Sequence, residues 1–355
     1  MLPNYYCYLQ SIPKAAQLAD RFYQKFVNFQ TFADPWLLKD DGGYRLFFLY
    51  SPDKGPWWWK TSEIHSAFST DLKHWQVFKA ILKPSSEGNW DSGRICAGCT
   101  YKEDGIYYLF YSGAGNGKDV MNEAIGLATS QDGVHWQRYS EKEFLKPNPD
   151  NPYYDTYKRD WFGEYYDHFQ WRDPYILKDN QTEKYYMFMS GFMKHSDNSH
   201  YRGCIGLAMA DKIIGPYQLL PPVSVPLIGK GLHFFSYEME RPQVIYKNGK
   251  YHLFFSTWKH AINPEWLEEV GNPDINDSCL YHYVANAITG PYQPISQIPI
   301  VQNSSKTGLY ATNLALLPDS IDNYFVYGWR PTACDIHIST NYRVNWEPNS
   351  IKVMA

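Results

Sequence analysis

The strongest constraint on the fold of this chain is a hairpin-like segment that occurs five times. Each copy has a short apolar run, a polar turn and a second run rich in Tyr and Phe, as in "DPYILKDNQTEKYYMFMSG" from Asp173. The other copies begin at Asp34, Ala97, Arg241 and Thr312, so successive starts are 63 to 76 residues apart. Apolar runs around turns such as "DDGG", "EDG" and "KNGK", where Gly and Asn accept positive φ, are typical of β-hairpins.

A second strand-turn-strand segment follows each of these hairpins, for example "EAIGLATSQDGVHWQRY" and "CLYHYVANAITGPYQPI". Each unit therefore holds about four strands. Five such units in one chain predict an all-β fold, a five-bladed β-propeller with four antiparallel strands per blade. The alternative is a β-sandwich, which would leave the fivefold recurrence as a coincidence.

Three parts of the chain lie outside the repeat. Residues 1–30 include apolar residues at helical spacing with Pro13 near a first turn, and we expect a short N-terminal helical cap there. Residues 147–170 and 258–277 are long insertions, and because long ordered loops are uncommon unless functional, we expect them to border a site. Residues 1–355 are expected to form a single domain.

Charge and hydropathy argue against two classes of partner. The net charge is −4 and no Lys/Arg cluster of the kind that follows phosphates is present, so we expect no nucleic acid. No apolar run approaches the roughly 18 residues of a membrane span. The N-terminus, "MLPNYYCYLQSIPKAAQLADRFYQKF", lacks the basic start and apolar block of a secretory signal, and we expect a cytoplasmic protein. The oligomeric state stays open.

The chain has six cysteines. Cys96 and Cys99 form a C-x-x-C pair, but no second pair completes a zinc site, and we expect both to be structural. Free thiols also suit a cytoplasmic location.

Carboxylates recur at the same place in the repeat. Asp34 and Asp173 each stand directly before a proline at the start of a unit, and Glu240 stands one residue earlier in the fourth unit, as Glu-x-Pro. The first strand of each unit lines the axis of a propeller, so these three side chains should converge. Cleavage of a glycosidic bond needs one carboxylate as nucleophile or base and one as proton donor, and a third can stabilise the transition state. The alternative is that Asp-Pro merely starts a strand.

The pattern resembles the five-bladed β-propeller glycoside hydrolases: families 32 and 68, which act on fructofuranosides, and family 43, which acts on arabinans and xylans. Its most specific parts are "WRDPYI" and "ERPQVIYKNGKYHLFFS". The resemblance implies that Asp34 is the nucleophile or the water-activating base, Glu240 the general acid/base and Asp173 the transition-state stabiliser. Glu238, two residues before Glu240, is the rival acid.

Two arginines flank these acids. Arg172 is expected to bind sugar hydroxyls and to keep Asp173 ionised. Arg241, directly after Glu240, is expected to point away from it, because neighbours on a strand face opposite sides.

Aromatic side chains are the expected sugar platform. "GPWWWK" places Trp57, Trp58 and Trp59 in a loop of the first unit. Trp90 and Asp91 lie in "NWDSGRICAGCT", which is similar to the second-blade segment of fructofuranosidases, and Trp161 precedes the third unit. We expect these six residues to contact substrate.

No cofactor is expected to be required. Family 43 members often hold an ion in the axial channel, and His337 is the candidate ligand for such an ion. The leading hypothesis is a glycosidase that cleaves a β-fructofuranoside, arabinofuranoside or xyloside. A transglycosylase, a phosphorylase, and a non-catalytic carbohydrate-binding or protein-docking propeller are the alternatives, because the fold alone does not decide function.

Overall fold

The computed structural model describes most of the chain from residue 31 onward. The described ranges are 31–52, 58–155, 157–161, 164–194, 203–224, 239–257, 279–295, 299–300, 309–330, 335–338, 342–347 and 350–354. The expected helical cap, residues 1–30, and the expected insertion at 258–277 lie outside these ranges. None of the helices in the described ranges has the length and apolar character to cross a membrane.

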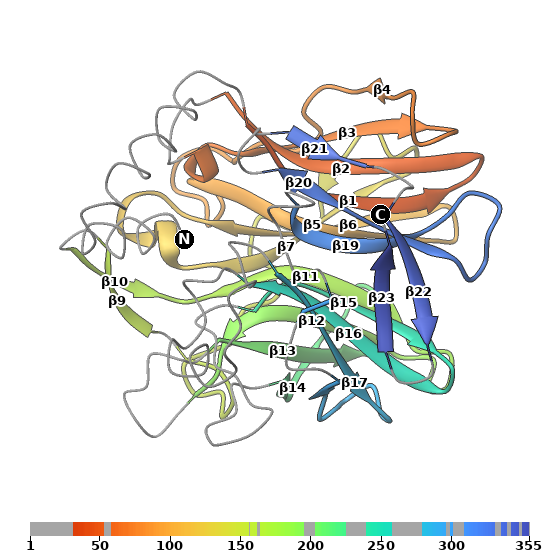
Figure 1. The fold of residues 1–355 in the computed structure, drawn as a ribbon. Helices are drawn as coiled ribbons and strands as arrows, with labels where there is room; N and C mark the ends of the chain where they lie inside the picture. The colour runs from red at the N-terminus through yellow and green to blue at the C-terminus, as the bar shows by residue number, and fades with distance from the viewer. Residues whose placement is uncertain are drawn as a thin grey trace, which may run out of the picture.

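Five antiparallel sheets, each with a path of four strands in chain order, confirm the five-bladed β-propeller (Figure 1). Blade 1 contains β1 (Thr31–Asp40), β2 (Gly43–Ser51), β3 (Glu63–Ser69) and β4 (Gln76–Val77). Blade 2 contains β5 (Arg94–Glu103), β6 (Ile106–Ala114), β7 (Ala124–Ser130) and β8 (Gln137–Arg138). Blade 3 contains β11 (Trp171–Lys178), β12 (Tyr185–Phe192), β13 (Gly203–Ala210) and β14 (Gln218–Ser224).

The last two blades differ in that blade 5 has an additional strand. Blade 4 contains β15 (Glu240–Lys247), β16 (Lys250–Thr257), β17 (Cys279–Ala285) and β18 (Gln293–Pro294). Blade 5 contains β19 (Tyr310–Leu316), β20 (Tyr324–Arg330), β22 (Arg343–Glu347) and β23 (Ser350–Met354), and β21 (Asp335–His337) also pairs with β20. Outside the blades are a hairpin of β9 (Tyr157–Trp161) and β10 (Glu164–His168) and two short 3-10 helices, η1 (Trp58–Lys60) and η2 (Gly117–Met121).

The first strand of each blade lies at the centre of the molecule. β1 contacts β5, β5 contacts β11, β11 contacts β15, β15 contacts β19, and β19 contacts β1 again, which closes the ring (Figure 1). Residues at equivalent positions of these strands therefore meet although they are far apart in sequence.

The hydrophobic cores lie between neighbouring blades. One core joins blades 3 and 4 through Phe188 and Phe255, which are fully buried, and another joins blades 2 and 3 through Phe110 and Met187. Burial on both faces explains why β12 is buried along its whole length and shows no alternation of polar and apolar residues. Each fully buried Phe contributes about 1.5–3 kcal/mol to stability.

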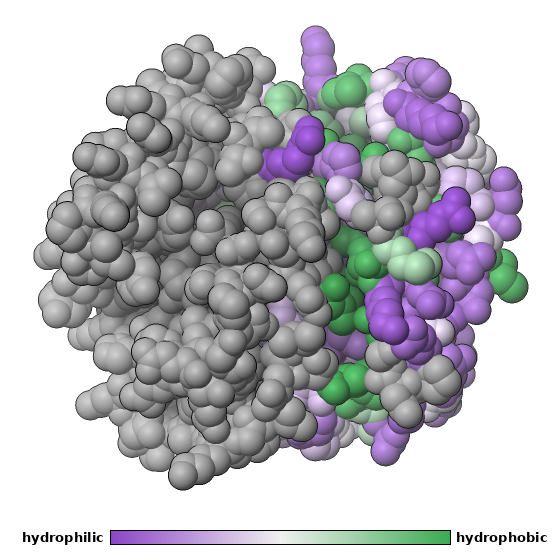
Figure 2. All heavy atoms as spheres, in the orientation of Figure 1, coloured by the Kyte–Doolittle hydropathy of each residue, from purple (hydrophilic) through white to green (hydrophobic). Residues whose placement is uncertain are grey.

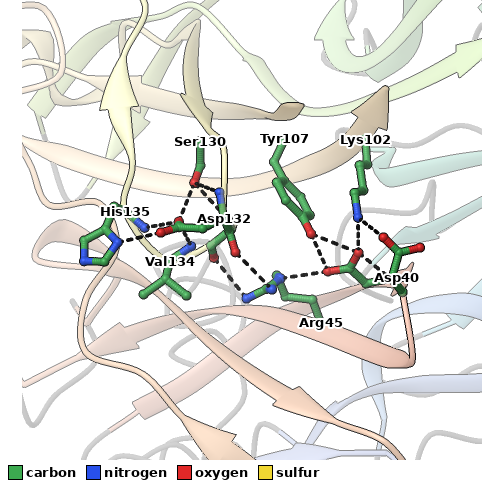
Figure 3. Close-up of polar contacts among 10 residues, drawn as sticks. Asp40, Arg45, Lys102, Tyr107, Ser130, Asp132, Val134 and His135 are labelled. Atoms are coloured by element: carbon green, nitrogen blue, oxygen red, sulfur yellow. Dashed lines mark hydrogen bonds and ion pairs between the residues drawn. The ribbon is translucent and has the colours of Figure 1, made fainter. Parts of the chain in front are cut away.

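Blades 1 and 2 end in the same turn, "STDLKHW" and "SQDGVHW". In the second, the Asp132 carboxylate accepts backbone N–H groups of Val134 and His135, each at 2.8 Å, and contacts the His135 ring at 2.7 Å (Figure 3). Asp71 makes the equivalent bonds in the first turn. These bonds to the charged form hold the pKa of both carboxyls well below its usual value. The repeat in the sequence is thus a repeat in local hydrogen bonding.

The described part of the surface in Figure 2 is mainly hydrophilic at its outermost points, and hydrophobic atoms show in the recesses between them. This is the usual surface of a folded domain whose apolar residues are packed between its blades.

Candidate active site

The inner strands of blades 1, 3 and 4 share one irregularity. Their bulges fall between Ala33 and Trp36, between Arg172 and Tyr175, and between Glu240 and Gln243. In each bulge, two residues that end in proline face a single residue of the next strand. Proline is tolerated there because a bulge leaves the extra residue outside the hydrogen-bond ladder.

The first residue of each bulge has a positive φ, which is 45° at Asp34, 55° at Asp173 and 55° at Arg241. Side chains other than Gly rarely adopt this region, and such residues cost on the order of 1–3 kcal/mol. Bulges of this kind re-aim side chains and often lie next to active sites. The structure thus makes Arg241 the repeat equivalent of Asp34 and Asp173, whereas Glu240 is the equivalent of Arg172.

Burial and neighbouring charges have opposing effects on the pKa of Asp34. Burial raises the pKa of this partly exposed carboxyl to about 6; the charge of Arg241 opposes that rise, and the charge of Asp173 adds to it. A carboxyl with this pKa is mostly ionised at neutral pH, as a nucleophile or base must be.

Asp173 is 6% exposed, and burial raises the pKa of its carboxyl while Arg172 and Arg241 oppose the rise. Its Oδ2 accepts the backbone N–H of Arg241 at 3.1 Å, and its own N–H donates to Ser112 Oγ at 3.2 Å. The second bond ties the bulge of β11 to β6 of blade 2.

Glu240 is 3% exposed and has a partner on each side. Arg172 Nη2 donates to its Oε1 at 2.6 Å, and the hydroxyl of Tyr310 donates to its Oε2. Arg172 comes from blade 3 and Tyr310 from blade 5, so this carboxyl is oriented by both neighbouring blades.

Arg172 links the acids to one another. Besides Glu240, its guanidinium contacts Glu123 Oε1 at 3.3 Å and lies 4.0 Å from Asp173 Oδ2. Glu123, which precedes β7, is 1% exposed and also pairs with Arg94 of β5. A buried chain of alternating charge therefore runs from Arg94 through Glu123 and Arg172 to Glu240.

Arg241 extends to blades other than its own. Nη2 donates to the carbonyl of Pro35 at 2.9 Å and to Asn313 Oδ1 at 3.1 Å, and Nη1 donates to the carbonyl of Gly98 at 3.3 Å. Its guanidinium is thus engaged by blades 1, 2 and 5 rather than by Glu240, as expected from the sequence.

The central channel begins beside these residues. A cavity of about 240 Å³ is lined by the inner strands of all five blades, with Asp173 and Arg241 among the lining residues. A larger cavity of about 420 Å³ lies at the other ends of these strands, where Lys39, Tyr246 and Tyr324 line it. The carboxylates, and not cavity size, mark the candidate active site.

The structure places the expected aromatic platform partly in the core. Trp58 is 7% exposed and packs edge-on against Trp329, with ring centroids 5.6 Å apart. Trp90 stacks on Tyr111 at 5.9 Å. Trp59 is partly exposed, and the guanidinium of Arg94 lies over its ring, 4.8 Å from the centroid. This cation–π contact joins Trp59 to the chain of alternating charges.

Asp91 lies in a buried network rather than at a surface. It is 1% exposed, and it accepts hydrogen bonds from Tyr111 and from Arg138, both at 2.9 Å, and from Ser85. These internal partners favour a structural role over the expected contact with substrate. Trp57 and Glu238 lie outside the described residues, as does the side chain of Trp161.

His337 lies on β21, which pairs with β20 and not with an inner strand, and its ring is 5.6 Å from that of Tyr342. It is not among the residues that line the axial cavity in the described part of the chain. Nor do the described residues include a group of three or more His, Cys, Asp or Glu that could hold a metal ion.

Cys96 and Cys99 are not disulfide-bonded, and Cys96 Sγ accepts a hydrogen bond from Arg94 at 3.2 Å.

Three residues of this site carried no signal in our sequence analysis: Arg94, Glu123 and Tyr310. Tyr310 stands two residues before the start of the fifth repeat, and Arg94 three residues before that of the second, so the positions flanking each repeat start could have identified both. Glu123 lies outside the inner strands, and no spacing pattern points to it.

The fold of this chain is shared with solved carbohydrate-active enzymes, a levansucrase and a family-43 glycoside hydrolase. The model of the glycosyl hydrolase family 32 N-terminal domain matches residues 32–201, and the model of the levansucrase/invertase family, glycosyl hydrolase family 68, matches residues 189–326. The chain is similar to the glycoside hydrolases of families 32 and 68, whose models together match residues 32–326.

Individual curated relatives show the same similarity. A levansucrase of Rahnella aquatilis is 25% identical over 248 residues, which is 63% of this chain and 55% of that protein. The chain thus spans about half of the length of the levansucrases that it matches.

Among solved structures, levansucrase of Bacillus subtilis superposes with a TM-score of 0.69 at 14% identity, covering 94% of this chain and 88% of that one. A thermostable family-43 glycoside hydrolase superposes with a TM-score of 0.61 at 16% identity, covering 93% and 95%. At these identities the superpositions bear on the fold alone.

Proposed function

We propose that this protein cleaves the glycosidic bond of sucrose or a related β-fructofuranoside and transfers the fructosyl unit to an acceptor hydroxyl, either of a sugar or of water. The single observation that carries the proposal is that Asp34, Asp173 and Glu240 come from three blades and each interacts with Arg172. The similarity to levansucrases supports a fructosyl substrate over an arabinosyl or xylosyl one.

The proposed reaction has two steps. Asp34 attacks the anomeric carbon of the fructosyl unit, and the bond to the glucosyl oxygen breaks as Glu240 donates a proton to that oxygen. The acceptor hydroxyl then loses its proton to Glu240 and attacks the fructosyl carbon, which releases Asp34. Asp173 stabilises the positive charge that develops on the sugar in each step.

Sugar transfer and hydrolysis share these residues and differ only in the acceptor. A non-catalytic scaffold would have no need for two acids, Asp34 and Asp173, in the strained position of their bulges, or for the buried Glu240 beside them, because each costs stability.

The test is to incubate the purified protein with sucrose and to measure glucose and free fructose separately. Glucose in excess of free fructose indicates transfer, and equal amounts indicate hydrolysis. Release of neither sugar, together with cleavage of a nitrophenyl arabinofuranoside or xyloside, would overturn the proposed substrate class.

A further inference from the structure

Glu123 is a buried carboxylate that takes no part in the proposed chemistry. It is 1% exposed, and no inner strand carries it, because it lies between η2 and β7. A carboxylate in such a place is costly unless its charge is paired and its oxygens accept hydrogen bonds.

Both oxygens of Glu123 are engaged on the side that faces the active site. Arg94 pairs with Oε1, Arg172 Nη1 contacts Oε1 at 3.3 Å and Oε2 at 3.4 Å, and the backbone N–H of Trp171 donates to Oε2 at 3.3 Å. Glu123 thus fixes both the guanidinium of Arg172 and the start of the strand that carries Asp173.

Arg172 creates a difficulty for the proposed acid. Its Nη2 lies 2.6 Å from Glu240, and a guanidinium at this distance favours the ionised carboxylate, whereas a proton donor must be protonated. A second carboxylate on the same guanidinium reduces that pull, because its negative charge opposes ionisation of Glu240.

We propose that Glu123 is a positioning residue that holds Arg172 between Glu240 and Asp173 and balances its charge, so that Glu240 keeps a proton at the pH of catalysis. This inference rests on the proposed function of Glu240.

Counting charges among the described residues supports this inference. Arg172 contacts Glu240, Glu123 and Asp173, and Arg94 contacts Glu123. Arg241 and Asp34 interact electrostatically with each other and with Asp173, so the connected set holds Arg94, Arg172 and Arg241 as cations and Asp34, Asp173 and Glu123 as anions, besides Glu240 itself. Three positive and three negative charges cancel, so a protonated Glu240 leaves the set neutral. Without the charge of Glu123, the set is neutral only when Glu240 is ionised. The influence of Glu123 also reaches Asp173, whose pKa it raises.

The central variant is Glu123→Gln, which keeps the size of the side chain and removes its charge. We expect kcat on sucrose to fall about 100-fold, as for a displaced catalytic group, with a smaller change in KM. Activity falls as pH rises through the pKa of the acid, and that pKa should be lowered in the variant. The alkaline limb of the kcat/KM profile should therefore move to lower pH.

The variant Arg94→Gln should shift the pH profile in the opposite direction. It also tests the inference if Glu123→Gln fails to fold. It removes a positive charge, so the alkaline limb should move to higher pH. Glu123→Asp keeps the charge and should leave the limb closer to that of the wild type than Glu123→Gln does.

Asp40→Asn is the matched control. Asp40 is a buried carboxylate bonded to Arg45 at 3.2 Å, Lys102 at 2.7 Å and Tyr107 at 2.8 Å, at the opposite end of β1 (Figure 3). The variant Asp40→Asn should lower the unfolding temperature and leave the pH profile of kcat/KM unchanged. The inference is overturned if the limb does not move in Glu123→Gln or Arg94→Gln, or moves equally in Asp40→Asn. Wild-type protein without fructosidic activity would instead overturn the proposed function.

Discussion

Asp34 and Asp173 occupy the same position in two different blades. Each is the first residue of a bulge, each precedes a proline, and their φ values are 45° and 55°. The charge of Asp173 helps to raise the pKa of Asp34. Rotational repetition of one local conformation has thus brought together two acids that lie 139 positions apart in the sequence.

The pKa of Asp34 predicts the acid limb of the pH profile. Because this pKa is raised to about 6 and the proposed role needs the ionised form, kcat/KM should fall about tenfold per pH unit below about pH 6. Initial rates on sucrose between pH 4 and pH 8, in buffers that match this range, would measure the limb. A profile that stays flat down to about pH 4 would contradict the assigned role.

Removal of Arg241 should destabilise the propeller. Arg241 is 5% exposed, and its guanidinium donates hydrogen bonds to Pro35, Gly98 and Asn313 on three different blades. Arg241→Met leaves these buried acceptors without a donor and should lower the free energy of unfolding by about 3–5 kcal/mol in urea titrations. Arg343→Met, at an exposed position of β22, is the control and should change it by less than about 0.5 kcal/mol. Equal effects of the two variants would argue against the role of Arg241 as a tie between blades.

A buried histidine pair predicts sensitivity to acid. His252 Nδ1 lies 2.9 Å from His282 Nε2, and burial, with a smaller effect of His252, lowers the pKa of His282 to about 3. Below about pH 6.5 the unfolded chain binds a proton that the folded chain does not, so stability is lost as pH falls, at about 1.4 kcal/mol per unit for this group.

The variant His282→Gln should therefore show a shallower loss of unfolding free energy between pH 6 and pH 4 than the wild type. His74→Gln, at an exposed turn, should change the slope much less than His282→Gln does. An identical slope in His282→Gln and the wild type would rule out His282 as the cause.

The fold was predictable because it is a repeat. Five hairpins with Gly and Asn turns fixed the number of blades and the position of each inner strand, and the predicted starts at 34, 97, 173, 241 and 312 fall within β1, β5, β11, β15 and β19. Repetition makes such a prediction robust, because an error in one unit is corrected by the other four.

The closeness of the three acids was predictable for the same reason, while their catalytic roles stay predictions. Their surroundings were not predictable. In the sequence, Glu240 stands one residue earlier in its unit than Asp34 and Asp173 do in theirs. The bulge explains this, because Arg241 takes the position with positive φ and Glu240 is the residue before it, which still pairs with the next strand. Glu123 comes from a connecting segment, so its contact with Arg172 depends on how two blades pack.

The packing of the tryptophans was not predictable from the sequence, and their contact with substrate stays a prediction. Trp58 and Trp90 were expected on a sugar platform, yet Trp58 is buried in the core that joins blades 1, 2 and 5, and Trp90 packs against that core. A large ring satisfies packing between sheets as well as it would bind a sugar, and its identity alone does not separate the two uses.

The most direct test of the central claim is the rate of glucose release from sucrose by Asp34→Asn, compared with the wild type and with Asp40→Asn. Loss of the proposed nucleophile should reduce the rate about 10⁴-fold or more, while circular dichroism and unfolding temperature show a folded protein and Asp40→Asn retains activity. A folded Asp34→Asn variant that releases glucose within about tenfold of the wild-type rate would contradict the account, because the convergence of acids at the channel would then have no part in the chemistry.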